Sequence, residues 1–77
     1  MDYRAFTNDS LTMMYESIRA ALESDDARKN AGQKPRFAVR ETPDWLEHAG
    51  NLEAEMLRRG MPFKIIDWSE DQERLPL

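Results

Sequence analysis

Apolar residues in the first third of the chain recur at steps of three and four, which places them on one face of an α-helix. This stripe consists of Leu11, Met14, Tyr15, Ile18, Ala21 and Leu22. A side-chain oxygen from residues 8–10 can cap the start, and we expect the helix to fade after Ser24 or to continue frayed to Gly32. Met13 lies off the stripe, so we predict that it is exposed on the monomer and is a candidate interface residue.

A second helical stripe follows a strong start signal at Thr42 and Pro43. Thr42 can cap the first turn, and Pro43 suits the first helical position because an N–H has no intrahelical partner there. Gly60 is the expected stop. The predicted core face comprises Trp45, Leu46, Ala49, Leu52 and Met56, with Leu57 at its margin.

Two short segments show the alternation of a half-buried strand. In the segment 36–41, Phe37 and Val39 alternate with arginines and an alanine, so both are predicted to face the core. The segment 62–68 predicts a second strand. Its two sides carry Phe63 and Ile65, and Ile66 and Trp68. Trp68 closes this strand, and we expect it to be partly exposed and to belong to an interaction surface.

The order helix, strand, helix, strand predicts a single α+β domain over residues 1–77, with a small βαβ unit and a flexible acidic tail at 69–77. A two-stranded sheet is marginal in water and has two open edges. We therefore expect a homodimer, formed by pairing of strand edges or by helix-to-helix packing about a two-fold axis. An alternative stays open, in which residues 36–41 are an extended loop and the chain is a helical hairpin with a β-tail.

Composition excludes several kinds of function. The 77 residues include no cysteine and one histidine, which excludes disulfides, Cys-based metal sites, a Cys nucleophile and a His-pair metal site within one chain. We expect no catalytic residue, no metal and no cofactor. A net charge of −4 argues against a nucleic-acid partner. There is no apolar run of membrane-spanning length and no signal-peptide pattern, so a cytoplasmic protein is expected.

Two features of the sequence qualify as candidate sites. Asp44 and His48 are four positions apart on the second helix, so a carboxylate can orient the imidazole, although a solvent-side helix pair is the plainer interpretation. The basic segment 28–40 holds five of the eleven positive charges and no acidic residue. Its Arg36 and Arg40 are candidates for binding an acidic partner, or else charges that protect an edge strand.

The segments SLTMMYESIRAAL, RETPDWLEHAGNLEAEMLRRGM and IIDW resemble short bacterial proteins with no assigned function, over about residues 8–68. The resemblance implies a bacterial cytoplasmic protein and carries no activity and no functional residue. We predict a non-catalytic protein that acts by protein–protein interaction, as a homodimer or adaptor, through the edge at 36–41 and the strand ending at Trp68. The alternative is a small regulator that contacts nucleic acid through the basic segment, and an enzyme using His48 comes third.

Overall fold

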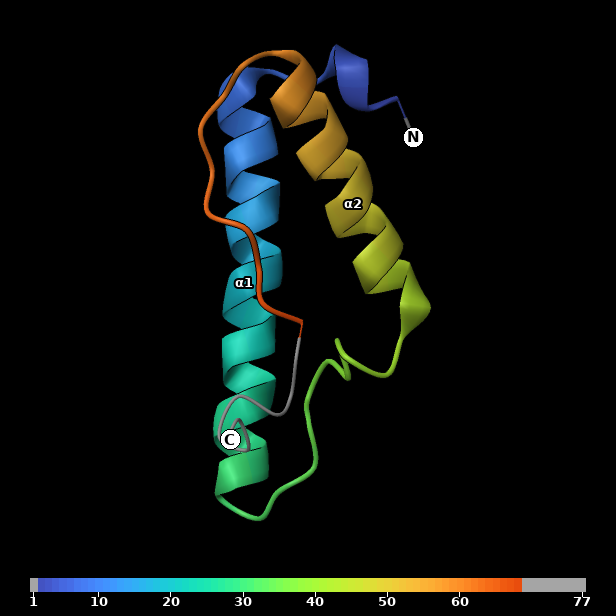
Figure 1. Cartoon of the computed structure of the whole chain (residues 1–77). Coiled ribbons are helices and arrows are strands. Elements are labelled where there is room, and N and C mark those ends of the chain that lie inside the picture. The colour runs from blue at the N-terminus through green and yellow to red at the C-terminus, as the bar shows by residue number, and fades with distance from the viewer. Residues whose placement is uncertain (1, 69–77) are drawn as a thin grey trace, which may run out of the picture.

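The chain folds as an antiparallel helical hairpin (Figure 1). The computed structural model describes residues 2–68, and within this range there is no β-strand. A short 3-10 helix η1 (Tyr3–Ala5) precedes helix α1 (Asn8–Asn30), and helix α2 (Pro43–Arg58) runs back beside α1. The predicted α+β class was therefore wrong, and the fold is all-α. The predicted acidic tail at 69–77 lies outside the described residues.

The helix α1 is longer than the first of the two predicted lengths. It passes Ser24 without a break and ends at Asn30. Gly32 then takes a φ of 79°, a left-handed conformation that glycine adopts without strain. The backbone N–H of Gln33 donates to the carbonyl of Arg28 at 2.8 Å, which satisfies a carbonyl of the last turn. The stop at Gly32 therefore follows the sequence signal for a helix C-terminus.

A threonine is the N-cap residue of each helix. Thr7, one position before the predicted capping residues 8–10, accepts a hydrogen bond from the backbone N–H of Ser10 at 3.0 Å. Thr42 is the N-cap of α2 as predicted, although its side chain makes no capping hydrogen bond. Pro43 occupies the first turn, and Gly60, with a φ of 72°, follows the end of the helix. The predicted start and stop of α2 are confirmed.

The core lies where the two helices face each other. Its buried residues are Leu11, Tyr15, Ile18, Ala21 and Leu22 from α1, Ala49, Leu52 and Met56 from α2, and Val39 and Ile66 from the segments after each helix. The predicted core face of α1 is confirmed. The predicted core face of α2 was wrong at Leu46, which is 53% exposed. The predicted exposure of Met13 is confirmed, since 69% of its surface is accessible.

The segment 36–41 is a loop whose backbone is bound by a carboxylate of α1. The two oxygens of Asp25 accept hydrogen bonds from the backbone N–H groups of Phe37 and Val39, both at 2.8 Å. Ala38, between them, has a φ of 53°, which an extended strand does not allow. The predicted strand is absent because its N–H donors bond to a side chain. Val39 faces the core as predicted, whereas Phe37 is 41% exposed.

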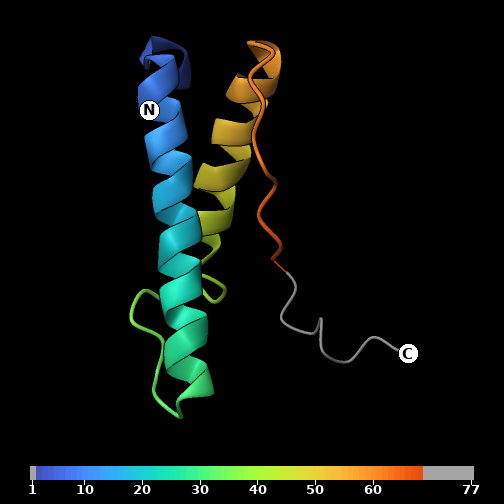
Figure 2. The same ribbon diagram turned by 90° about the vertical axis from the view of Figure 1, so that its left-hand side faces the viewer.

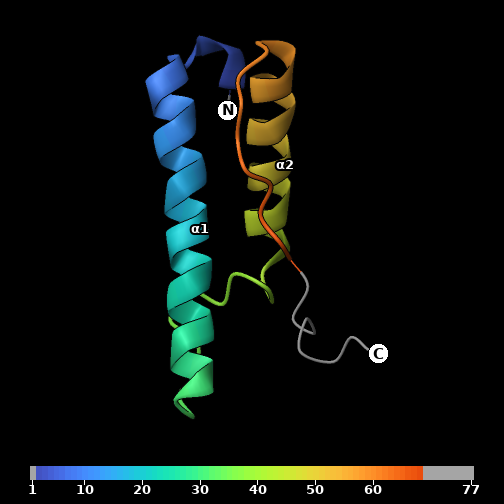
Figure 3. The same cartoon turned by 60° about the vertical axis from the view of Figure 1, so that its left-hand side comes forward.

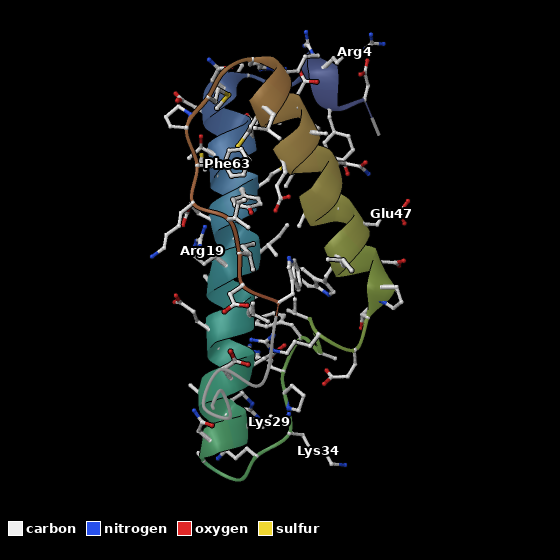
Figure 4. All side chains as sticks on the ribbon, viewed as in Figure 1. Arg4, Arg19, Lys29, Lys34, Glu47 and Phe63 are labelled. Carbon is white, nitrogen blue, oxygen red and sulfur yellow. The ribbon has the colours of Figure 1, made fainter. Side chains whose placement is uncertain are left out.

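We call residues 61–68 the strap, because this segment returns along the hairpin after α2 (Figure 2; Figure 3). Ile66 is buried, and its backbone N–H donates to the hydroxyl of Tyr15 at 3.0 Å. The guanidinium of Arg19 donates to the strap carbonyl of Lys64. The second predicted strand is therefore absent as well, because side chains of the helices take the strap's backbone groups. Phe63 lies over α1 in Figure 4, with its ring edge-on to Tyr15.

Candidate interaction surface

A buried tyrosine joins the two helices and the strap. The hydroxyl of Tyr15 donates to a carboxylate oxygen of Glu53 on α2 at 2.5 Å and accepts the N–H of Ile66. Burial, followed by the hydrogen bond to Glu53, raises the pKa of Tyr15 to about 12. The phenol is therefore neutral at pH 7 and acts as a structural link.

A second buried group, Glu55, lies at the end of the hairpin where α2 ends beside the start of α1. Hydrogen bonds from Arg58 and then Arg59 lower the pKa of Glu55 to about 2, so it stays ionised. Arg59 lies 2.7 Å from the carboxylate and also donates to Asn8 at 2.8 Å and to the carbonyl of Tyr3. This network ties the end of α2 to the start of the chain, which is a structural role.

His48 is held by an aromatic residue, contrary to the predicted pair with Asp44. Its Nδ1 lies 2.6 Å from the hydroxyl of Tyr3, and the two rings are 5.5 Å apart. The contact fixes η1 against α2. Among residues 2–68 no group of three or more histidines, cysteines, aspartates or glutamates is placed to hold a metal ion. The histidine therefore serves the packing of the N-terminal segment.

The predicted pair Arg36 and Arg40 does not form one free basic surface. Arg40 is 10% exposed; it lies 2.9 Å from Asp26 and donates to the carbonyl of Trp68. Trp68 is half-buried against the core, so the predicted partial exposure is confirmed. Arg36 is exposed and stacks its guanidinium over Phe37 at 5.7 Å. The two arginines therefore have different surroundings, and one of them holds the loop to α1.

The rest of the basic segment lies at the loop end of the hairpin. Figure 4 shows Lys29 and Lys34 there, near the turn that follows α1. The guanidinium of Arg28 donates to the carbonyl of Lys34 at 2.9 Å and so braces this turn. A small hollow in this region is lined by carboxylates and cations together, namely Asp25, Asp26 and Glu41 with Lys29 and Arg40. The basic run therefore includes residues that stabilise the loop itself.

One side of α2, away from the core, exposes large apolar side chains that the packing of the hairpin does not explain. Leu46 is 53% exposed and Leu57 is 68% exposed. They are eleven positions apart, about three helical turns, and therefore lie on the same side of the helix. We call this side the α2 outer face; its exposed members are Pro43, Leu46, Gly50, Ala54 and Leu57.

Two opposite charges lie along one edge of the α2 outer face. Glu47 lies near the start of α2 and points away from α1 (Figure 4). Arg58 lies at the other end, and its side chain is 60% exposed although it also contacts Glu55. Both follow the apolar members by one position, at Leu46 and Leu57, so they share an edge of the face. The face is therefore apolar in the middle and carries opposite charges at its two ends.

Sequence reasoning missed this surface because it assigned Leu46 to the core. A signal was present, since Leu46 and Leu57 share a direction that differs from the line through Ala49, Leu52 and Met56. Among residues 2–68, the other large exposed apolar residues are each on a different element: Met13 on α1, Phe37 in the loop and Ile65 on the strap.

Within residues 2–68, none of the helices has the length and apolar character needed to cross a membrane. No protein-family model, no curated protein and no solved structure matches the chain.

Proposed function

We propose that the chain is a non-catalytic interaction protein that binds a protein partner through the α2 outer face. The observation that carries the proposal is the exposure of Leu46 and Leu57 on one side of a helix whose opposite side is fully packed. Burial of a fully exposed leucine contributes about 1.5–3 kcal/mol, and covering the exposed 53% of Leu46 and 68% of Leu57 gives the corresponding part of that for each. A helix that presents apolar anchors to a partner is a common mode of recognition.

The structure changes the surface through which this function is expected to act. The strand edge at 36–41 does not exist, so binding by strand pairing is replaced by binding through a helix. The basic segment presents less positive charge to a partner than its composition suggests, because Arg40 is paired with Asp26. The contact of His48 with Tyr3 supports a non-catalytic protein, and a location in the bacterial cytoplasm is part of the same proposal.

A photo-crosslinking amino acid at position 57 tests this proposal inside cells that make the protein. The matched control carries the same group in place of Ala20, which is exposed on the outer side of α1. We expect a covalent protein adduct from position 57 and none from position 20. The absence of an adduct at position 57, or the same adducts from both positions, contradicts the proposal.

A further inference from the structure

We propose that the partner of the α2 outer face is a second copy of this chain, packed antiparallel to the first about a two-fold axis. This inference rests on the proposed function, because it names the occupant of the same surface. It follows from how the residues of one face are ordered along α2. A two-fold interface requires a surface that is complementary to itself.

An antiparallel pair of α2 helices matches the apolar residues of the face. With the axis passing midway between Gly50 and Ala54, Leu46 of one copy lies beside Leu57 of its partner, and the reverse contact follows by symmetry. Four leucine side chains are then covered together, two from each copy. Gly50 and Ala54 lie at the crossing point, where small residues allow two helices to approach closely.

Charge complementarity decides the direction of the pair. In the antiparallel arrangement Glu47 of one copy lies beside Arg58 of its partner on the same edge, and the symmetry repeats this ion pair. A parallel arrangement about a two-fold axis places the charged edges of the two copies on opposite sides of the seam, so Glu47 and Arg58 then have no opposite charge beside them. The ordering of the two charges along the face therefore favours the antiparallel pair.

The middle of the face is open within the monomer. A Cβ added at Gly50 meets no other atom within 4 Å, so the chain's own packing does not require a glycine at this position. Glycine inside a helix costs about 1 kcal/mol relative to alanine. A second helix lying against this position gives the glycine a packing role, which agrees with the direction set by the charges.

The interface is small, and we therefore expect a weak dimer that dissociates on dilution. One face of a 16-residue helix is about 24 Å long and supplies two large apolar side chains per copy. Sedimentation equilibrium over a wide range of protein concentration is the suitable measurement. We expect the mass to rise from 9.0 kDa towards twice that value with concentration.

Charge exchange provides the decisive variants. Glu47→Arg makes both residues of the edge positive, and Arg58→Glu makes both negative. Each variant alone replaces two attractions by two repulsions and should weaken the dimer about tenfold or more. An equimolar mixture of the two variants should recover association, because each copy then meets the opposite charge. The double variant Glu47→Arg/Arg58→Glu should recover it as well.

This recovery cannot arise within one chain. Glu47 and Arg58 are eleven positions apart on one helix, about 16 Å, so they cannot pair in the same copy. Far-UV circular dichroism and thermal unfolding of each variant show whether its fold is intact. The contact between Arg58 and Glu55 is lost in both variants that carry Arg58→Glu, the single and the double, whereas recovery in the mixture reports contact between copies.

The outcomes separate this inference from the proposed function. Weakened single variants with a restored mixture support the antiparallel dimer. A wild-type chain that stays at 9.0 kDa at every concentration overturns it, and so does equal association of all variants. If the crosslinker at position 57 gives an adduct heavier than a dimer while the pure protein is monomeric, the dimer fails and the proposed function stands.

Discussion

A single carboxylate determines the path of the loop between the two helices. Asp25 is 4% exposed, and burial alone raises the pKa of such a group. Hydrogen bonds from the backbone N–H groups of Phe37, Val39 and Arg36 outweigh burial and lower its pKa. The charged side chain thus substitutes for the neighbouring strand that these N–H groups would otherwise need.

The replacement Asp25→Asn tests this role. An amide offers one oxygen and two N–H donors, so at least one loop N–H loses its partner in a buried place. We expect the free energy of unfolding to fall by about 1–3 kcal/mol, measured by urea denaturation. Glu23→Gln on the exposed side of α1 is the control, with a change within about 0.5 kcal/mol. Equal stability of the two variants contradicts the assigned role.

The strap is the element that completes the core without regular secondary structure. Its consecutive isoleucines point in opposite directions: Ile66 is 3% exposed and Ile65 is 67% exposed. The strap stays extended because Tyr15 and Arg19 bond to its backbone. The alternation of buried and exposed residues in the sequence is therefore real. It arises because the extended strap packs on the helices, and not because the segment is a strand in a sheet.

The two isoleucines provide a matched pair of variants. Ile66→Ala removes buried methyl groups and leaves a cavity, so we expect a loss of about 2–5 kcal/mol in the free energy of unfolding. Ile65→Ala should change it by less than about 0.5 kcal/mol. Both are measured by chemical denaturation under one set of conditions. A strap that contributes nothing to stability would give two equally stable variants.

At the scale of the whole molecule, buried ionic groups close both ends of the hairpin. Asp25 holds the connecting loop to α1, and Glu55 with Arg59 holds the end of α2 to the N-terminal segment. Both carboxylates have a lowered pKa in the folded chain. Their contribution to stability is complete above the unfolded pKa and is lost as the pH falls through the folded pKa.

Acid should therefore destabilise the protein over a defined range. The ordinary pKa of Glu55 is 4.5 and its folded value is about 2, so we expect the midpoint of thermal unfolding to fall as the pH is lowered between these values. Glu55→Gln should flatten this part of the curve, and Asp25→Asn should reduce it further. Glu23→Gln serves again as the control, with the wild-type slope. A Glu55→Gln protein with an unchanged slope would show that this group does not carry the effect.

The two helices and the core face of α1 could be predicted from the sequence because the signals are local. Periodic apolar residues, Thr42 with Pro43, and the glycines after each helix act within a few positions of the chain. The stripe on α1 and the exposure of Met13 followed from the same periodicity. The excluded cysteine chemistry likewise required only the composition.

Only the tertiary structure decided which groups bond to the backbone N–H groups of the loop and the strap. The loop and the strap alternate like strands, yet Asp25 and Tyr15 reach them from positions 12 to 51 residues away and bind their N–H groups. Such distant partners leave no trace in a local pattern. The α2 outer face needed the tertiary structure for another reason: Leu46 and Leu57 share a direction in the sequence pattern, but Leu46 is also adjacent to the core stripe. Whether it is buried depends on the direction from which α1 approaches α2, which packing alone determines.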